Sequence, residues 1–503
     1  MKKSNDRDLL LSRRAFIRQS SCAALGITGV VNTLAHLTLT RAALAQVTAP
    51  ADYKALVVVF LYGGNDSNNV LIPRLGHPAY ADYKTHRGIL GILDPNDPAY
   101  VAGRPASIAL TGEGAGYGVH PSLQPVADLF NSGELAFVAN VGTLAFPLTR
   151  TQYLAGSVPL PFQLFSHSDQ QIEWQSSVAD KAFQSGWGGR VADLLKQEGY
   201  SGDKVSLSVT ISGINSLQVG SDVVQYTVSP SGAVTLGGFG SNYSSAKNAD
   251  GSYKTSSTGQ RLKAFDEITA FTHQHLLEDG YNQIVRRARA GEAIVGSAFT
   301  AAAQQGVNLD TLFAGATSSL GTQLKTVAKL IAGRDALDNR RQIFFCSVGG
   351  YDTHSDQLAS QANLMGELGS SLKAFSDSLI ALGVNDKVLT LSHSDFTRTF
   401  TPNGVDAAAG SDHAWGGHHV VMGGPVNGGK IYGTFPSLKV GMDQDAGTTR
   451  GRWIPTTSVD QYAAVAARWI GVESSALSAI FPNLGRFDDP FSAGANLGYV
   501  SLV

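Results

Sequence analysis

The chain has 503 residues, of which 43% are hydrophobic and 16% are charged, and it contains 56 glycines. A chain of this length can bury a large core and exceeds one small domain. Its formal net charge of −2 gives no reason for binding nucleic acid through bulk charge, so we expect no nucleic-acid partner.

The N-terminus has the pattern of an export signal. Residues 12–18 (SRRAFIR) resemble a twin-arginine signal, and a mildly apolar stretch follows at 22–40. The tripeptide Ala43-Leu44-Ala45 fits a cleavage site of small residues. A membrane anchor is the alternative, but polar residues interrupt the apolar stretch, which makes it a poor span. We therefore predict a signal peptide at residues 1–45.

Cleavage would leave a mature chain of residues 46–503 in the periplasm or outside the cell, with no stable membrane span. This chain would have 31 basic and 38 acidic residues, a net charge of −7. One cysteine would remain, Cys346, and it lies within an apolar run. A single cysteine cannot form an internal disulfide, so we expect it in the core.

Apolar runs predict five β-strands. Several are apolar without interruption, as is typical of strands buried on both faces of a parallel sheet. Helical patterns lie between them, at 121–133, 172–178 and 355–382, and another begins at the Ser458 capping box with Gln461. The segment at about 204–258 alternates apolar and polar residues, which predicts a small antiparallel insertion. The predicted strands are 55–62, 135–141, 343–348, 387–391 and 419–422.

Acidic residues follow three of these strands. Two glycines and then Asp66 come after the first strand, and two glycines, Asp352 and His354 come after the third. Asp395 lies just beyond the strand at 387–391. Ligands bind at the carboxyl ends of strands in open α/β sheets, so these side chains are candidates for one pocket. Turn chemistry alone also explains Asp66 taken singly.

The stretch 391–424 is the most unusual part of the sequence. It contains four of the twelve histidines, with two aspartates among them. Imidazoles and carboxylates that converge from strand ends are the ligands that zinc or manganese prefers. The alternative is a polar loop with scattered surface histidines. The residues are His393, His413, His418, His419, Asp395 and Asp412.

Another polar cluster, Ser166-His167-Ser168-Asp169, precedes a helical pattern. Ser168 or Asp169 could cap that helix. A helix N-terminus also favours an anion or an activated oxygen nucleophile. The two interpretations are compatible, and both remain open from the residues alone.

Together, the motifs resemble the family known as domain of unknown function 1501, which is similar to the alkaline phosphatase and sulfatase superfamily. The resemblance covers nearly the whole mature chain. It implies a doubly wound, mostly parallel α/β sheet with one or two divalent ions at the strand ends. The motifs are GGNDSNN (63–69), SHSDQQ (166–171), GGYDTHSDQ (349–357), SDFTRT (394–399), SDHAWGGHH (411–419) and IPTTSVDQYAA (454–464).

The resemblance also implies roles for individual residues. Ser166 or Ser168 would take the position of the nucleophile, with His167 beside it, and Arg398 would hold an anionic group in a forked contact. The metal ligands would be Asp66, Asp352, His354, Asp395, Asp412, His413 and one of His418 or His419.

From these residues we expect an exported, metal-dependent hydrolase of small anionic phosphate or sulfate esters. The attacking group would be a serine or a metal-bound hydroxide. We do not expect a formylglycine sulfatase. Such enzymes need the motif Cys-x-Pro-x-Arg, and Cys346 is followed by Ser-Val-Gly. The alternative is a non-catalytic, exported metal-binding protein that acts in cell-surface assembly or with a protein partner.

Overall fold

A computed structural model describes most of the chain beyond residue 51. No helix within this described part is long and apolar enough to cross a membrane. The predicted signal peptide at residues 1–45 lies outside the described residues. The described residues are 52–502, except 203, 231, 241–242, 272–275 and 448.

A large, mostly parallel sheet forms the centre of the fold. Its order is β12-β5-β11-β10-β1-β9-β6-β7-β8, with β13 (Thr457–Ser458) paired to β5 outside this path. The central strand β1 (Lys54–Leu61) pairs in parallel with β9 (Arg341–Val348) on one side and β10 (Val388–Ser394) on the other. Seven of its eight residues are buried, which confirms the prediction of a parallel strand covered on both faces.

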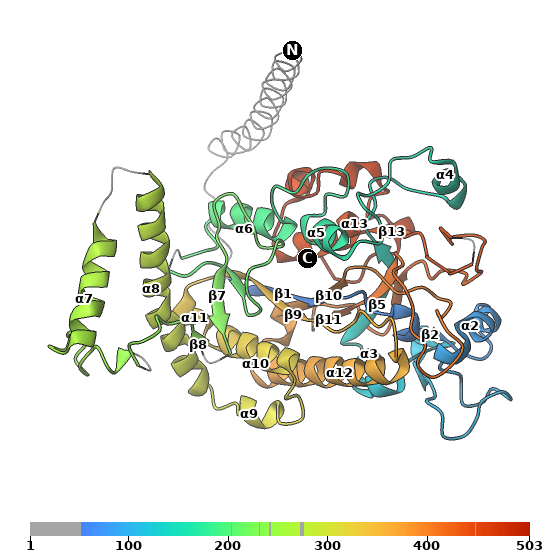
Figure 1. Cartoon of the computed structure of the whole chain (residues 1–503), viewed down its shortest axis with the longest axis horizontal. Helices are drawn as coiled ribbons and strands as arrows, with labels where there is room; N and C mark the ends of the chain where they lie inside the picture. The colour runs from blue at the N-terminus through green and yellow to red at the C-terminus, as the bar shows by residue number, and fades with distance from the viewer. Residues whose placement is uncertain are drawn as a thin grey trace, which may run out of the picture. The chain divides into compact units, whose positions relative to one another are not determined.

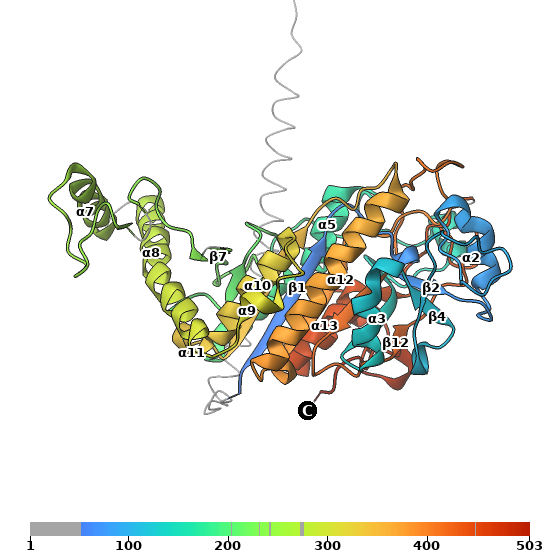
Figure 2. The same cartoon turned by 90° about the horizontal axis from the view of Figure 1, so that it is seen from below.

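Helices cover both faces of this sheet (Figures 1 and 2). Successive β1 residues alternate between two hydrophobic cores, with Val57 and Val59 in one and Val58 and Phe60 in the other. The first core is closed by α3 (Gln124–Asn131), α10 (Ser319–Ala332) and α12 (Gln357–Ala381). The second is closed by α5 (His167–Ser176), α6 (Trp187–Gln197) and α13 (Val459–Ile470).

Two parts of the fold are antiparallel. Strand β11 (Gly417–Met422) lies between β10 and β5 (Leu135–Gly142) and runs antiparallel to both. A separate three-stranded sheet, in the order β2-β4-β3, forms within a region of the sequence that looks like loop. Its strands are β2 (Leu71–Pro73), β3 (Ile108–Ala109) and β4 (Tyr117–Val119).

The segment predicted as an antiparallel insertion at about 204–258 is built differently. Strands β6 (Ser208–Thr210) and β7 (Tyr226–Ser229) extend the main sheet in parallel, so the prediction was wrong for both. Only the pair of β7 with β8 (Gly232–Ala233) is antiparallel. Alternating polarity indicates that one face of a strand is buried, but it carries no information about the direction of the neighbouring strand.

For two helices, the observed first residue can be compared with the one that the local sequence predicts. The capping box of Ser458 with Gln461 is present at the start of α13, as predicted. Helix α5 begins at His167, five residues earlier than predicted, because its polar first turn lacks apolar periodicity. The other helices are α2 (Tyr80–Arg87), α4 (Arg150–Ala155), α7 (Ser257–Ala270), α8 (Leu276–Ala303), α9 (Leu309–Leu312), α11 (Arg334–Leu337) and α14 (Leu477–Ile480), and the remaining strand is β12 (Ile431–Gly433).

Candidate metal centre

The parallel pairing aligns the carboxyl ends of three strands. Leu61 at the end of β1 lies level with Val348 of β9 and Ser394 of β10. The loops that follow are therefore forced together. A Cβ at Gly63 would lie 2.4 Å from the backbone nitrogen of Asp352, and Gly63 has a φ of +113°, so a glycine is required there.

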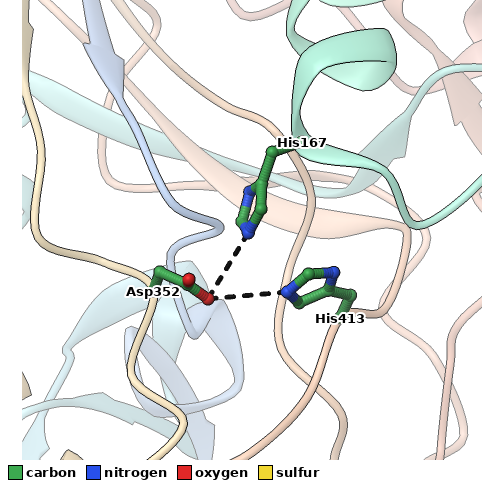
Figure 3. A group of neighbouring side chains, drawn as sticks. All are labelled: His167, Asp352 and His413. Carbon is green, nitrogen blue, oxygen red and sulfur yellow. Dashed lines mark ion pairs between the residues drawn. The ribbon is translucent and has the colours of Figure 1, made fainter.

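Three imidazoles converge on one carboxylate oxygen at this edge. The Oδ1 atom of Asp352 lies 3.1 Å from Nε2 of His354, 3.4 Å from Nε2 of His167 and 3.5 Å from Nε2 of His413. The Nε2 atoms of His354 and His413 are 3.0 Å apart. Figure 3 shows His167, at the start of α5, and His413, in a loop, both directed at Asp352, and potential ligand atoms of these three residues lie within 4.8 Å of one another.

The other nitrogen of each ring faces an oxygen acceptor. Nδ1 of His167 lies 2.6 Å from Oδ2 of Asp395, and Nδ1 of His354 lies 3.2 Å from Oδ1 of Asp412. Nδ1 of His413 lies 2.7 Å from the carbonyl oxygen of Phe165. A backbone carbonyl can only accept, and a carboxylate does the same, so we assign a proton to each Nδ1. The Nε2 atoms are then the available ligand positions.

The pKa values of the residues in this group are shifted in different directions. Burial by itself raises the pKa of Asp352, but the Arg398 guanidinium, whose Nη1 lies 2.6 Å from Oδ1, holds that pKa below its usual value. The hydrogen bond to Asp395 raises the pKa of His167, whereas burial lowers the pKa of His413. A cation that binds at Nε2 of His167 would therefore displace a proton that Asp395 helps to hold.

Asp395 and Asp412, both predicted as ligands, lie behind the imidazoles. Asp395 is fully buried and accepts hydrogen bonds from the backbone N–H of Gly63, from the Gln171 side chain and from His167. Asp412 pairs with Arg450 in addition to His354. Their oxygens are thus directed at neighbouring donors, which is the position of carboxylates that orient metal-binding histidines.

The structure does not bring Asp66, His418 or His419 into this group. Asp66 is buried and paired with the buried Arg87 and with Gln357, so its charge is compensated within the core. His418 and His419 lie on β11 rather than beyond it, and both are buried. Burial lowers the pKa of each to about 3.

The two predicted nucleophiles occupy the start of α5. Ser166 is the N-cap residue, and its Oγ donates to Oδ2 of Asp169 at 2.5 Å. Ser168 and Asp169, the two residues that could have capped the helix, both lie within its first turn, so neither is the N-cap. The extended backbone at Ser166 marks the helix boundary two residues earlier.

Arg398 has no exposed surface. Besides Asp352, its guanidinium donates to the carbonyl oxygens of Gly63 and Ser411. These bonds direct the guanidinium at the loops that follow β1 and β9. The forked contact with an anionic substrate therefore has no support from this geometry, and Arg398 instead supports Asp352.

Sequence reasoning missed three contributors: Gln171, the carbonyl of Phe165, and Arg450. Gln171 follows His167 by four residues on α5, so the two side chains share a helix face, and this spacing could have revealed their common partner. Nothing in the local sequence marks the other two, because a carbonyl carries no residue-type signal and Arg450 acts on a distant loop.

Comparisons with known proteins were made against families, curated proteins and solved structures. The family described as "Protein of unknown function (DUF1501)" matches residues 53–450. No curated protein matches the sequence. Two crystal structures are similar at low levels: "Ps i-CgsB in complex with k-i-k-neocarrahexaose" (9% identity, TM-score 0.29) and "Ps i-CgsB" (10% identity, TM-score 0.30). Each match covers 86% of this chain and 77% of the other, and TM-scores this low do not establish a shared fold.

Proposed function

We propose that the chain, which belongs to the family of proteins of unknown function DUF1501, is an exported metal-dependent hydrolase of phosphate or sulfate esters. The observation that carries this proposal is the convergence of three Nε2 atoms on Asp352, with an acceptor behind every ring. The Arg398 guanidinium compensates part of the Asp352 charge, and a cation among these atoms would add to that compensation.

The spacing of these atoms fits a small divalent ion. Zinc binds imidazole nitrogen at about 2.0–2.1 Å, which separates neighbouring ligands of a tetrahedral site by roughly 3.3 Å. Oδ1 of Asp352 lies 3.4 Å from Nε2 of His167 and 3.5 Å from Nε2 of His413, and ligand atoms of these three residues all lie within 4.8 Å of one another. A donor set rich in imidazole favours zinc or manganese over calcium. A bound ion of this kind acts as a Lewis acid toward an ester oxygen.

The residues of the chain would then hold the substrate and move its protons. Ser166 adjoins His167 at the N-terminus of α5, where the helix dipole favours an anionic group. The Asp169 carboxylate already accepts from the Ser166 hydroxyl and can take its proton as the oxygen bonds to phosphorus or sulfur, the bond to the ester oxygen breaks and the alcohol leaves. Water would then cleave the seryl ester and release phosphate or sulfate. A water attacking in place of Ser166 is the other route.

A second function is favoured by two specific observations. The Ser166 hydroxyl is hydrogen-bonded within its own helix, and Arg398 is fully buried. A protein that binds metal without catalysis, and acts with a protein partner at the cell surface, needs neither group to reach a substrate. Function is decided by the site rather than by the fold, so activity must separate the two.

The deciding experiment uses the mature chain from residue 46 onward, loaded with zinc or manganese. A panel of aryl phosphate monoesters, phosphate diesters and sulfate esters would be assayed before and after chelation. We expect chelator-sensitive hydrolysis of at least one class, loss of most activity in Ser166→Ala, and a much smaller loss in Ser168→Ala. Full activity in both variants would favour attack by water. No hydrolysis by the metal-loaded chain would favour the non-catalytic function.

Export is part of the proposal and has its own test. The paired Arg13-Arg14 motivates it. Replacing both arginines by lysine should leave full-length precursor in the cytoplasm, detected by cell fractionation. Unimpaired export of that variant would remove this part of the proposal without affecting the metal site.

A further inference from the structure

We infer that the centre holds one ion, bound by Nε2 of His167 and His413 and by Asp352, and that Asp395 is a positioning residue that keeps the proton on Nδ1 of His167. This inference rests on the metal dependence in the proposed function and deepens it. It fixes the number of ions and replaces part of the ligand set that the family resemblance implies.

The count of one ion follows from how the neighbouring carboxylates are used. A two-metal site needs a second set of ligands roughly 4 Å away. Asp395 and Asp412 are the acids nearest to the imidazoles, but Asp395 already accepts four hydrogen-bond contacts and Asp412 accepts from Arg450 and His354. Within the described part of the chain, His167, Asp352 and His413 form the one group of His, Cys, Asp or Glu with ligand atoms this close.

Asp352 can bind an ion and Arg398 at the same time. A carboxylate has about four lone-pair directions on its two oxygens. The guanidinium uses one of these at Oδ1, 2.6 Å away. The second lone pair of Oδ1, the atom on which the Nε2 atoms converge, is left for the ion, and the side chain is 46% exposed.

The role of Asp395 follows from its partners, which are all donors. The Gly63 N–H lies 3.2 Å from both oxygens, and the Gln171 amide nitrogen lies 2.8 Å from Oδ2. An acceptor-only group is needed between them, and it obliges Nδ1 of His167 to donate as well. The ring then presents the unprotonated Nε2 to the ion. That atom is buried and has no hydrogen-bond partner.

Substitution of Asp395 by asparagine would reverse this arrangement. With its NH2 group turned toward Gly63, asparagine would place two donors against each other. With its NH2 group turned toward His167, the asparagine oxygen still accepts from the Gly63 N–H, and the Gln171 amide can rotate to present its own oxygen to that NH2 group. Nδ1 of His167 must then accept, so the proton moves to Nε2 and blocks the ligand position.

The test measures zinc binding by the full mature chain. We expect one zinc per chain by elemental analysis after dialysis, and competition with a chromophoric chelator should show a Kd that rises about 10–100-fold in Asp395→Asn. Gln171→Ala is the comparison variant: it removes a donor to the same oxygen but leaves the acceptor in place, so its Kd should rise less than that of Asp395→Asn. Nitrogen NMR of labelled histidine should show Nδ1 of His167 protonated in the zinc-loaded parent.

Each result supports or overturns the inference. Two zinc ions per chain would overturn the count, and an unchanged Kd in a folded Asp395→Asn would overturn the positioning role. If that variant fails to fold, the NMR measurement decides, and a protonated Nε2 of His167 in the zinc-loaded parent would overturn the positioning role. Zinc binding as expected, without hydrolysis of any ester, would leave this inference standing while the proposed function fails. Hydrolysis of an ester by protein with two ions bound would support the proposed function and overturn this inference.

Discussion

Two sets of three histidines in this protein have opposite environments. The edge set, His167, His354 and His413, lies in loops or at a helix start beyond the carboxyl ends of strands, and each ring is partly exposed with an oxygen acceptor at Nδ1. The core set is His393, His418 and His419. Its members lie within β10 and β11, are at most 5% exposed and contact aromatic rings such as Trp174 and Phe435.

The comparison shows that residue type and clustering in the sequence do not identify a metal ligand. His413 belongs to the edge set and His418 to the core set, although only five residues separate them. Burial lowers the pKa of His418 and His419 to about 3 and the pKa of His393 well below its usual value, so the core set is neutral at physiological pH. The two sets differ in whether Nε2 of each ring faces other groups that could bind the same ion.

The largest effect that sharpens this contrast is loss of metal from the edge set. Asp352→Ala and His413→Ala should each lower the zinc content of dialysed protein by more than about tenfold, because each removes a ligand. Stabilisation by zinc should disappear with it. At a zinc concentration about 100 times the Kd, the parent should gain about 2.7 kcal/mol, which calorimetry in the presence and absence of zinc would detect. Normal zinc content in both variants would break the contrast.

The second expected effect is a loss of folding stability when a histidine of the core set is substituted. His418→Ala should lower the free energy of unfolding by about 3 kcal/mol, because it leaves a cavity beside Phe435 and an unpaired backbone N–H at Asn140. Its zinc content should match that of the parent. Urea unfolding followed by fluorescence measures the first quantity. A loss of zinc from a folded His418→Ala would place this residue in the edge set.

The smallest effect is a pH dependence. The folded-state pKa of His418 is about 3, below the usual value of 6.5 for the unfolded chain. The unfolded chain therefore binds a proton first, and the stability present above pH 6.5 is lost as pH falls toward 3. Between pH 6.5 and 5 this residue should contribute up to about 1.4 kcal/mol per pH unit.

His418→Gln tests that slope. Glutamine does not titrate and can still accept from the Asn140 N–H, so the variant should lose about 1–2 kcal/mol less than the parent over this interval in urea titrations. Zinc-free protein should be used, so that proton release by the metal site does not contribute. An unchanged slope would mean that His418 titrates equally in the folded and unfolded chain.

Local sequence determined the strands and several helix boundaries of this protein. Runs such as 55–62 and 343–348 contain enough apolar residues to be buried on both faces, and the pair Ser458 and Gln461 closes hydrogen bonds within one turn. The position of acids just beyond β1, β9 and β10 was also readable, because strand ends follow directly from the apolar runs.

Only the tertiary structure decided how these pieces combine. The sequence does not encode strand direction at β6 and β7 locally, because β6 takes its direction from its pairing with the distant strand β9, and β7 then pairs with β6. Likewise, Asp395 and Asp412 could be taken for ligands until the contacts of their oxygens with Gly63, His167, His354 and Arg450 were known. A carboxylate binds an ion or orients an imidazole according to which donors surround it, and those donors come from loops that meet only when the sheet has formed.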